Sequence, residues 1–146
     1  MSIFDSLRAG ITTHSAAEMQ AIAAEIARAI AGRTETTLAL HGDLGTGKTT
    51  FTQGLARAIG IQEPVTSPTF GIFTLHRGEP VSLVHLDAYR LENARQLEDL
   101  MIEDFLRPPY ILVAEWPERV AEWIPRDAIH LWLSIDRDES HSIQWR

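Results

Sequence analysis

Residues 42–49 combine glycines with one lysine and one hydroxyl in a fixed order. They read Gly-Asp-Leu-Gly-Thr-Gly-Lys-Thr, the pattern G-x-x-x-x-G-K-[ST] of a phosphate-binding loop. Small residues let several backbone N–H groups point at one phosphate, while Lys48 supplies a charge for the β and γ phosphates. The Thr49 hydroxyl can bind magnesium. We expect a nucleoside triphosphate to be held by Gly42, Asp43, Leu44, Gly45, Thr46, Gly47, Lys48, Thr49 and Thr50.

Two apolar stretches further along the chain end in an acid. Residues 81–86 lead into Asp87, and residues 111–114 lead into Glu115. Triphosphate chemistry needs an acid at the tip of a neighbouring strand, which holds magnesium directly or through water. A carboxylate in an apolar strand is costly unless a cation pairs with it. We therefore expect both acids to serve the nucleotide site; the alternative for each is an acid that simply reaches solvent.

Hydroxyl residues lie in the loop that follows the expected nucleotide-binding helix. Thr66, Ser67 and Thr69 come 17 to 20 residues after Thr49. In switch-type nucleotidases such a hydroxyl senses the γ phosphate and the metal. A helix-to-strand loop with Ser-Pro turn chemistry explains the same residues equally well, so both interpretations stay open.

Aromatic and imidazole side chains flank the two acids. Trp116 directly follows Glu115 and could cover the nucleotide or fill the core, which is the commoner role of tryptophan. The six histidines show no metal-ligand spacing. His41 and His85 lie next to candidate site residues, where we expect hydrogen-bonded imidazoles at strand ends rather than catalytic groups.

The elements that must position these residues alternate between helical and extended patterns. Ser15 and Glu18 form a capping-box pattern at the start of the first expected helix. Helices are expected over 15–31, from Lys48 to Gly60 and over 94–106, the last with Leu97, Leu100, Met101 and Phe105 facing inward, and Pro117 begins one helical turn. Strands are expected over 36–41, 70–76, 81–87, 110–114, 128–135 and about 140–145.

This order of elements predicts an α/β fold. A strand, the phosphate loop and a helix packed behind it are typical of P-loop NTPases, with further strands beside them. The short connection between 70–76 and 81–87 predicts a hairpin, so the sheet should mix parallel and antiparallel strands. The 146 residues suit a single P-loop ATPase domain over 1–146.

Composition narrows the class of protein. The net charge is −7 and no Lys/Arg run is present, which argues against direct binding of DNA or tRNA. The absence of cysteine excludes thiol catalysis and disulfides. No signal peptide or membrane-length apolar stretch is found, so we expect a cytoplasmic protein without a membrane partner. The guanine-reading Asn-Lys-x-Asp is missing, which favours ATP.

Four sequence blocks together resemble the TsaE (YjeE) family, the ATPase subunit of bacterial tRNA threonylcarbamoyladenosine biosynthesis. The blocks occur in the family's order between about residues 36 and 120. The phosphate loop alone is generic, whereas the other three are specific in combination. The four blocks are residues 42–50, Val-Thr-Ser-Pro-Thr-Phe at 65–70, His-Leu-Asp-Ala-Tyr-Arg-Leu at 85–91 and Glu-Trp-Pro-Glu at 115–118.

The resemblance implies a role for each site residue. Lys48 and the loop amides would hold the phosphates of ATP, Thr49 and Glu115 would bind Mg²⁺, and Asp87 would support hydrolysis. It further implies that Thr69 belongs to a switch-like catalytic segment and that Trp116 lies near the nucleotide. The implied partner is the TsaB–TsaD complex, which modifies A37 of tRNA, so that tRNA is reached only indirectly. Many family members carry Gly-Arg near the C-terminal hairpin, where this chain has Asp138-Glu139 after Arg137.

Two other functions use the same loop. A small-molecule kinase would need an acceptor pocket and a mobile lid, for which 146 residues leave little chain. A nucleotide-dependent interaction switch would use hydrolysis only to end binding. A low intrinsic ATPase rate is predicted, because no arginine is an evident catalytic finger in the same chain. Dependence of the ATPase on a partner is what the resemblance implies.

Overall fold

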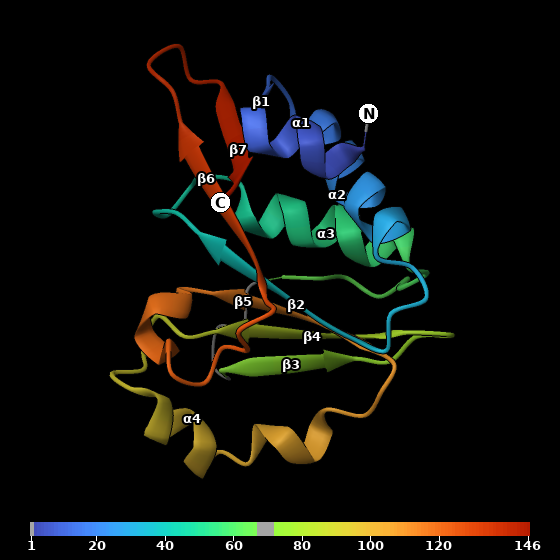
Figure 1. Ribbon diagram of the computed structural model, residues 1–146, viewed down its shortest axis with the longest axis vertical. Helices are drawn as coiled ribbons and strands as arrows, with labels where there is room; N and C mark the ends of the chain where they lie inside the picture. The colour runs from blue at the N-terminus through green and yellow to red at the C-terminus, as the bar shows by residue number, and fades with distance from the viewer. Residues whose placement is uncertain (1, 67–71) are drawn as a thin grey trace.

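The computed structural model describes residues 2–66 and 72–146, which form one mixed sheet (Figure 1). The order of its seven strands is β1-β7-β6-β2-β5-β4-β3. The strands are β1 (Ile11–Thr13), β2 (Glu35–His41), β3 (Phe73–His76), β4 (Ser82–Asp87), β5 (Tyr110–Glu115), β6 (Ile129–Ile135) and β7 (His141–Trp145). The expected strands are therefore confirmed to within one residue at their ends, apart from the expected strand 70–76: β3 begins at Phe73, and residues 70 and 71 lie outside the described residues.

Parallel pairing dominates the centre of the sheet. β2 pairs in parallel with both β5 and β6, and β5 pairs in parallel with β4. β3 is antiparallel to β4, which confirms the predicted hairpin, and β7 is antiparallel to β6 and β1. The predicted mixed α/β fold is thus observed. The carboxyl ends of β2, β4 and β5 meet at one edge, where ligands bind in such sheets.

Helices cover both faces of the sheet. α2 and α3 pack together on one face and α4 lies on the other, as Figure 1 shows. The helices are α1 (Ile3–Ala9), α2 (Ala16–Ala29), α3 (Lys48–Ala58) and α4 (Ala94–Asp99), with 3-10 turns η1 (Ile102–Phe105) and η2 (Pro117–Val120). Among the described residues, no helix is long and apolar enough to cross a membrane.

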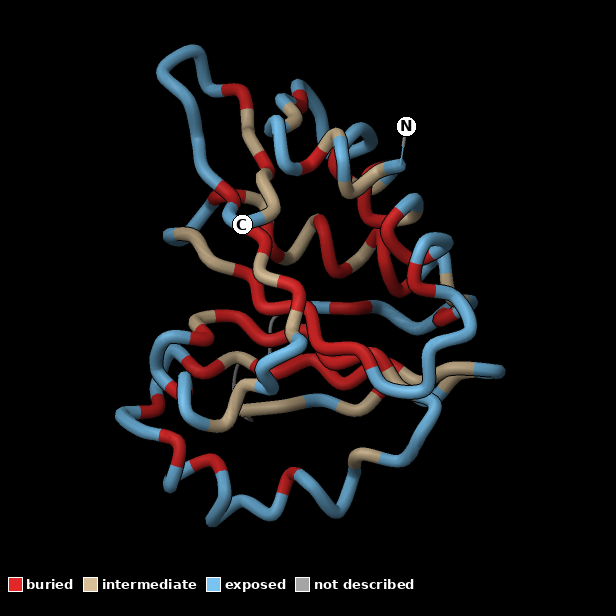
Figure 2. Tube along the Cα trace, viewed as in Figure 1, coloured by how far each residue is buried: buried red, intermediate tan, exposed pale blue. Residues whose placement is uncertain are grey.

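Alternation along the strands divides the core into two layers. Leu83 and Val113 face the layer that contains α2 and α3, whereas Val84 and Leu112 face the layer that contains α4. Buried positions concentrate on the central strands and the inner sides of α2 and α3 (Figure 2). Since side chains alternate with a period of two, residues 85 and 87 of β4 and residue 115 of β5 share the α3 face.

The expected helix over 94–106 is wrong in its second half. α4 ends at Asp99, and Met101 adopts a left-handed backbone with φ 57° before η1 begins. The helical spacing is lost at this break, because a left-handed residue cannot continue a right-handed helix; Ile102, directly after it, is buried instead. Leu97 is buried as predicted, whereas the three other apolar side chains expected inside are exposed: Leu100, Met101 and Phe105.

The N-terminal segment contains structure that the sequence patterns did not reveal. Ser2 and Asp5 form a full capping box that starts α1, and β1 then pairs with β7. At Ser15 only half of the expected box is present. Its hydroxyl accepts the Glu18 N–H, but the Glu18 carboxylate accepts the N–H of His14 instead. A three-residue strand carries too little periodicity to be recognised alone.

Candidate functional site

The phosphate loop connects the end of β2 to the start of α3, as predicted. Gly42, Gly45 and Gly47 all have positive φ angles, which glycine adopts at little cost. At Gly42 a Cβ would lie 2.5 Å from the carbonyl oxygen of Leu133 in β6. This close approach of β6 explains why glycine is needed there. Gly47 precedes α3 directly, so the helix N-terminus faces the loop.

Lys48 is buried, with only 5% of its surface exposed. Its ammonium donates a hydrogen bond to the Gly42 carbonyl oxygen at 2.5 Å and lies 4.2 Å from the ring centroid of Trp116. Burial lowers the pKa of Lys48, and the nearby carboxylates of Glu115 and Asp87 oppose that shift. The charge most suited to bind phosphate is therefore held inside the site rather than in solvent.

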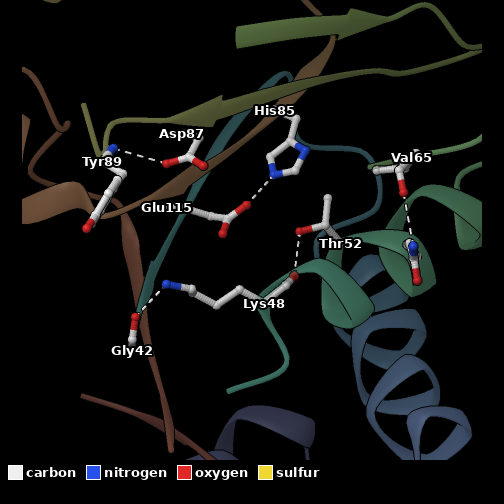
Figure 3. Close-up of polar contacts among 9 residues, drawn as sticks. Gly42, Lys48, Thr52, Val65, His85, Asp87, Tyr89 and Glu115 are labelled. Atoms are coloured by element: carbon white, nitrogen blue, oxygen red, sulfur yellow. Dashed lines mark hydrogen bonds and ion pairs between the residues drawn. The ribbon is translucent and has the colours of Figure 1, made fainter. Parts of the chain in front are cut away.

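Asp87 and Glu115 are direct neighbours across β4 and β5. The register pairs Asp87 with Glu115 and pairs Glu115 with Leu40, just before the phosphate loop. Asp87 accepts the N–H of Tyr89 at 3.0 Å. Burial raises the pKa of Asp87, and the neighbouring charge of Glu115 raises it further. The structure thus brings both predicted acids to the sheet edge beside Lys48 (Figure 3).

Glu115 is buried against a histidine. Its carboxylate accepts a hydrogen bond of 2.6 Å from Nε2 of His85, and the two residues expose 4% and 0% of their surface. The expectation of a hydrogen-bonded imidazole at position 85 is confirmed. Glu115 does not simply reach solvent, so the alternative interpretation of that acid is wrong.

Trp116 lies over the loop lysine and is only partly buried. It has a left-handed backbone with φ 56°, and its ring also contacts Tyr89 with 5.0 Å between centroids. Strained backbone at a non-glycine residue is concentrated at functional sites. The side chain therefore closes one side of the site around Lys48 in addition to packing against the core.

A cavity of about 200 Å³ opens on the other side of the loop. It lies between the segment that precedes α2, the phosphate loop and the turn before β7. The lining residues are Thr13, His14, Ser15, Ala16, Met19, Gly47, Thr50, Glu139 and His141. Arg137 is exposed in the turn between β6 and β7, and Glu139 lines the cavity.

His141 belongs to the site although the sequence patterns did not predict it there. Its Nδ1 lies 2.8 Å from the carbonyl oxygen of Thr46, and since a carbonyl only accepts, Nδ1 carries the hydrogen. Thr46 in turn donates to the carbonyl of Asp43 at 2.8 Å. The contact between His141 and Thr46 spans 95 residues, and no motif signals it.

The remaining predicted residues occupy less enclosed positions. Thr49 and Thr50 lie in the first turn of α3 and are partly exposed, whereas Asp43 and Leu44 are exposed at the loop tip. Thr69 lies outside the described residues.

No group of three or more histidines, cysteines or acids that could bind a metal occurs in residues 2–66 and 72–146. One or two carboxylates with a hydroxyl are nevertheless the donors with which proteins hold Mg²⁺ beside a phosphate.

Comparison with known proteins agrees with this geometry. The family model described as "Threonylcarbamoyl adenosine biosynthesis protein TsaE" matches residues 13–143, which is most of the chain. The chain belongs to the TsaE family. The resemblance inferred from the four blocks is confirmed, and this TsaE match extends beyond them to include β6 and most of β7.

Curated TsaE proteins from several bacteria are similar in sequence. Each is named tRNA threonylcarbamoyladenosine biosynthesis protein TsaE. The Bacillus subtilis protein is 35% identical over 73% of this chain and 66% of its own length, and the Treponema pallidum protein is 36% identical over 71% and 76%. The Streptomyces coelicolor protein is 43% identical over 67% of this chain and 66% of its own length. The chain therefore spans about two thirds of two of these relatives.

The fold of this TsaE-family chain also matches a solved structure. The crystal structure of Bacillus subtilis YdiB superposes with a TM-score of 0.75 and 29% sequence identity. The match covers 93% of this chain and 82% of YdiB. The arrangement of strands and helices described above is therefore shared with an experimentally solved protein.

Proposed function

We propose that this chain binds ATP with magnesium and hydrolyses it as the ATPase subunit for threonylcarbamoyladenosine modification of tRNA. The observation that carries the proposal is the meeting of Lys48, Asp87 and Glu115 at one sheet edge. A phosphate loop alone predicts binding. Two carboxylates beside its lysine, one of them buried, support hydrolysis as well.

In this proposal the phosphates lie against the loop amides and the start of α3. Lys48 exchanges its hydrogen bond with the Gly42 carbonyl for contacts with the β and γ phosphates. The cavity lined by Thr13, Ser15 and Thr50 would receive the adenine or the ribose, because it opens beside Gly47 at the same loop. In this arrangement Lys48 binds the phosphates on one side of the loop, and the cavity holds the nucleoside on the other side.

Thr49 and Glu115 are the residues that would hold Mg²⁺. Oxygen donors from one hydroxyl and one carboxylate fit this ion, and a buried carboxylate gains from a cation. When bound, Mg²⁺ neutralises developing charge on the phosphate oxygens. Asp87 would orient the attacking water and accept its proton, which fits a carboxyl whose pKa is raised above the ordinary value. Thr69 would add a switch-like hydroxyl, a role that depends on the family resemblance.

The partner in this proposal is the TsaB–TsaD complex. The family's role in tRNA threonylcarbamoyladenosine biosynthesis supports a shared pathway, and the net charge of −7 favours contact with protein over contact with tRNA. Arg119 lies on η2 near the site, but its guanidinium is directed at Tyr89, 5.6 Å from the ring centroid. A group that completes the charge stabilisation is therefore expected from the partner.

The test is release of phosphate from ATP by the chain alone and with purified TsaB–TsaD. We expect a slow rate alone and a rise of at least about tenfold with the complex, since an arginine supplied in trans can contribute a thousandfold or more. Equal rates would contradict partner-completed catalysis. Transfer of phosphate to a metabolite rather than to water would instead support a kinase.

A further inference from the structure

The pairing of β4 with β5 places His85 beside Glu115. His85 is the register partner of Val113, two residues before Glu115. Side chains two apart on a strand share a face, so His85 and Glu115 are diagonal neighbours on the side covered by α3. In Figure 3 the Glu115 carboxylate lies between the imidazole of His85 and the side chain of Lys48.

The hydrogen bond between them fixes how the carboxylate is presented. Nε2 of His85 donates to Oε2 of Glu115 at 2.6 Å, because an ionised carboxylate can only accept. The imidazole is fully buried and Glu115 is nearly so, which leaves the pair little freedom to rotate. One carboxylate oxygen is thus occupied, and the other remains available on the side of the phosphate loop.

We propose that His85 is a positioning residue that aims Glu115 at the magnesium ion. The proposal rests on the proposed function, in which Glu115 is a metal ligand. Groups that hydrogen-bond to a metal-binding carboxylate orient it, and loss of such a group typically weakens metal affinity by 10- to 100-fold. The alternative is that the pair only stabilises the core.

The geometry of the contact selects the variants. Glutamine places its amide nitrogen near the position of Nε2, so His85→Gln can keep the hydrogen bond. Asparagine places its amide near Nδ1 and cannot reach Glu115. A second buried histidine offers a matched control, because Nδ1 of His76 contacts Glu63 at 2.6 Å at the end of β3. Because that contact uses Nδ1, which a glutamine amide does not replace, the disruptive change at this position is His76→Gln.

The measurement is the affinity for Mn²⁺ in the presence of a non-hydrolysable ATP analogue, followed by electron paramagnetic resonance. We expect His85→Asn to weaken Mn²⁺ binding by about tenfold or more, with His85→Gln within about threefold of the parent chain. His76→Gln should leave Mn²⁺ affinity unchanged even if its melting temperature falls. Equal Mn²⁺ affinity in the parent chain and His85→Asn, with Glu115→Gln weakened, would overturn the proposal.

A double-mutant cycle separates positioning from general stability. If His85 acts through Glu115, His85→Asn should change Mn²⁺ affinity little in a Glu115→Gln background. The same loss in both backgrounds would show an effect that does not pass through Glu115, and would overturn the proposal. If Glu115→Gln alone leaves Mn²⁺ affinity unchanged, the magnesium assignment in the proposed function fails as well.

Discussion

The ammonium of Lys48 lies 4.2 Å from the ring centroid of Trp116, the residue that directly follows the buried acid Glu115. The indole and the Gly42 carbonyl together hold the positive charge at the mouth of the loop. A cation over an indole face is stabilised by about 0.5–2 kcal/mol, which is less than its interactions with a triphosphate. Nucleotide binding should therefore move Lys48 away from the ring.

The first prediction uses Trp116 as a reporter of that movement. Titration with ATP should change the tryptophan fluorescence of the parent chain, and this response should disappear in Trp116→Phe although calorimetry still detects binding. The three other tryptophans remain in that variant and serve as the internal control. A full fluorescence response in Trp116→Phe would show that the signal comes from elsewhere.

The second prediction concerns the stability contribution of Asp87. Burial raises its pKa above the ordinary value of 3.8, so the folded state disfavours the ionised form. At pH 7, without divalent ions, Asp87→Asn should therefore stabilise the fold, by less than about 1 kcal/mol because the group is only half-buried. The gain should vanish as the pH falls below 3.8, where the carboxyl is protonated both folded and unfolded.

Thermal melts across this pH range measure the Asp87 effect. Asp99→Asn on α4 is the matched control, because Asp99 is exposed and its removal should leave the melting temperature nearly unchanged. The Asp87 variant should also lose ATP hydrolysis if the proposed function holds. A melting temperature below that of the parent chain at pH 7 would contradict the stability argument.

The third prediction concerns the hydrogen bond between His141 and the loop. His141→Ala should weaken binding of an ATP analogue by about three- to tenfold, because one hydrogen bond that shapes the loop contributes about 0.5–1.5 kcal/mol. The contact uses Nδ1, so His141→Asn should largely restore binding, whereas His141→Gln should not. Calorimetric titration distinguishes these variants. Equal affinity in all of them would remove His141 from the site.

The fourth prediction concerns a close approach of α2 and α3. A Cβ at Gly54 would lie 2.5 Å from Cα of Gln20, so the two helices can pack this closely only without a side chain there. Gly54→Ala should destabilise the fold by about 1–3 kcal/mol, against the usual helix preference for alanine. Arg57→Ala, on an exposed position of the same helix, should change little in the same denaturation experiment.

Much of the fold could be predicted because local patterns and tertiary structure agree. The apolar strand before the phosphate loop, the hairpin and the continuous apolar stretch ending at Glu115 are all local patterns, and each forms a strand in the sheet. The end of α4 at Asp99 could not be predicted, because the apolar residues that follow keep a helical spacing although the backbone at Met101 is left-handed. A single residue in that conformation leaves no clear mark on a periodic pattern.

The candidate site likewise contains residues that could be predicted from the sequence and contacts that could not. Lys48, Asp87 and Glu115 were predicted because each follows a recognisable run of residues, and parallel strands place such positions at one edge. The pairing of His85 with Glu115 depends on register, and the contact of His141 with Thr46 depends on the course of the last two strands. These relationships are set by tertiary structure, which a single sequence does not display.

The link between His141 and Thr46 has a consequence for how the protein is made. Thr46 in the motif leaves the ribosome 95 residues before His141, which contacts it, and β6, which borders β2, also follows the motif in the chain. A nascent chain thus displays a complete nucleotide-binding sequence well before it possesses the strands that organise it. We expect competence to bind ATP to arise only after β6 and the start of β7 have been synthesised, because His141 in β7 holds the loop at Thr46.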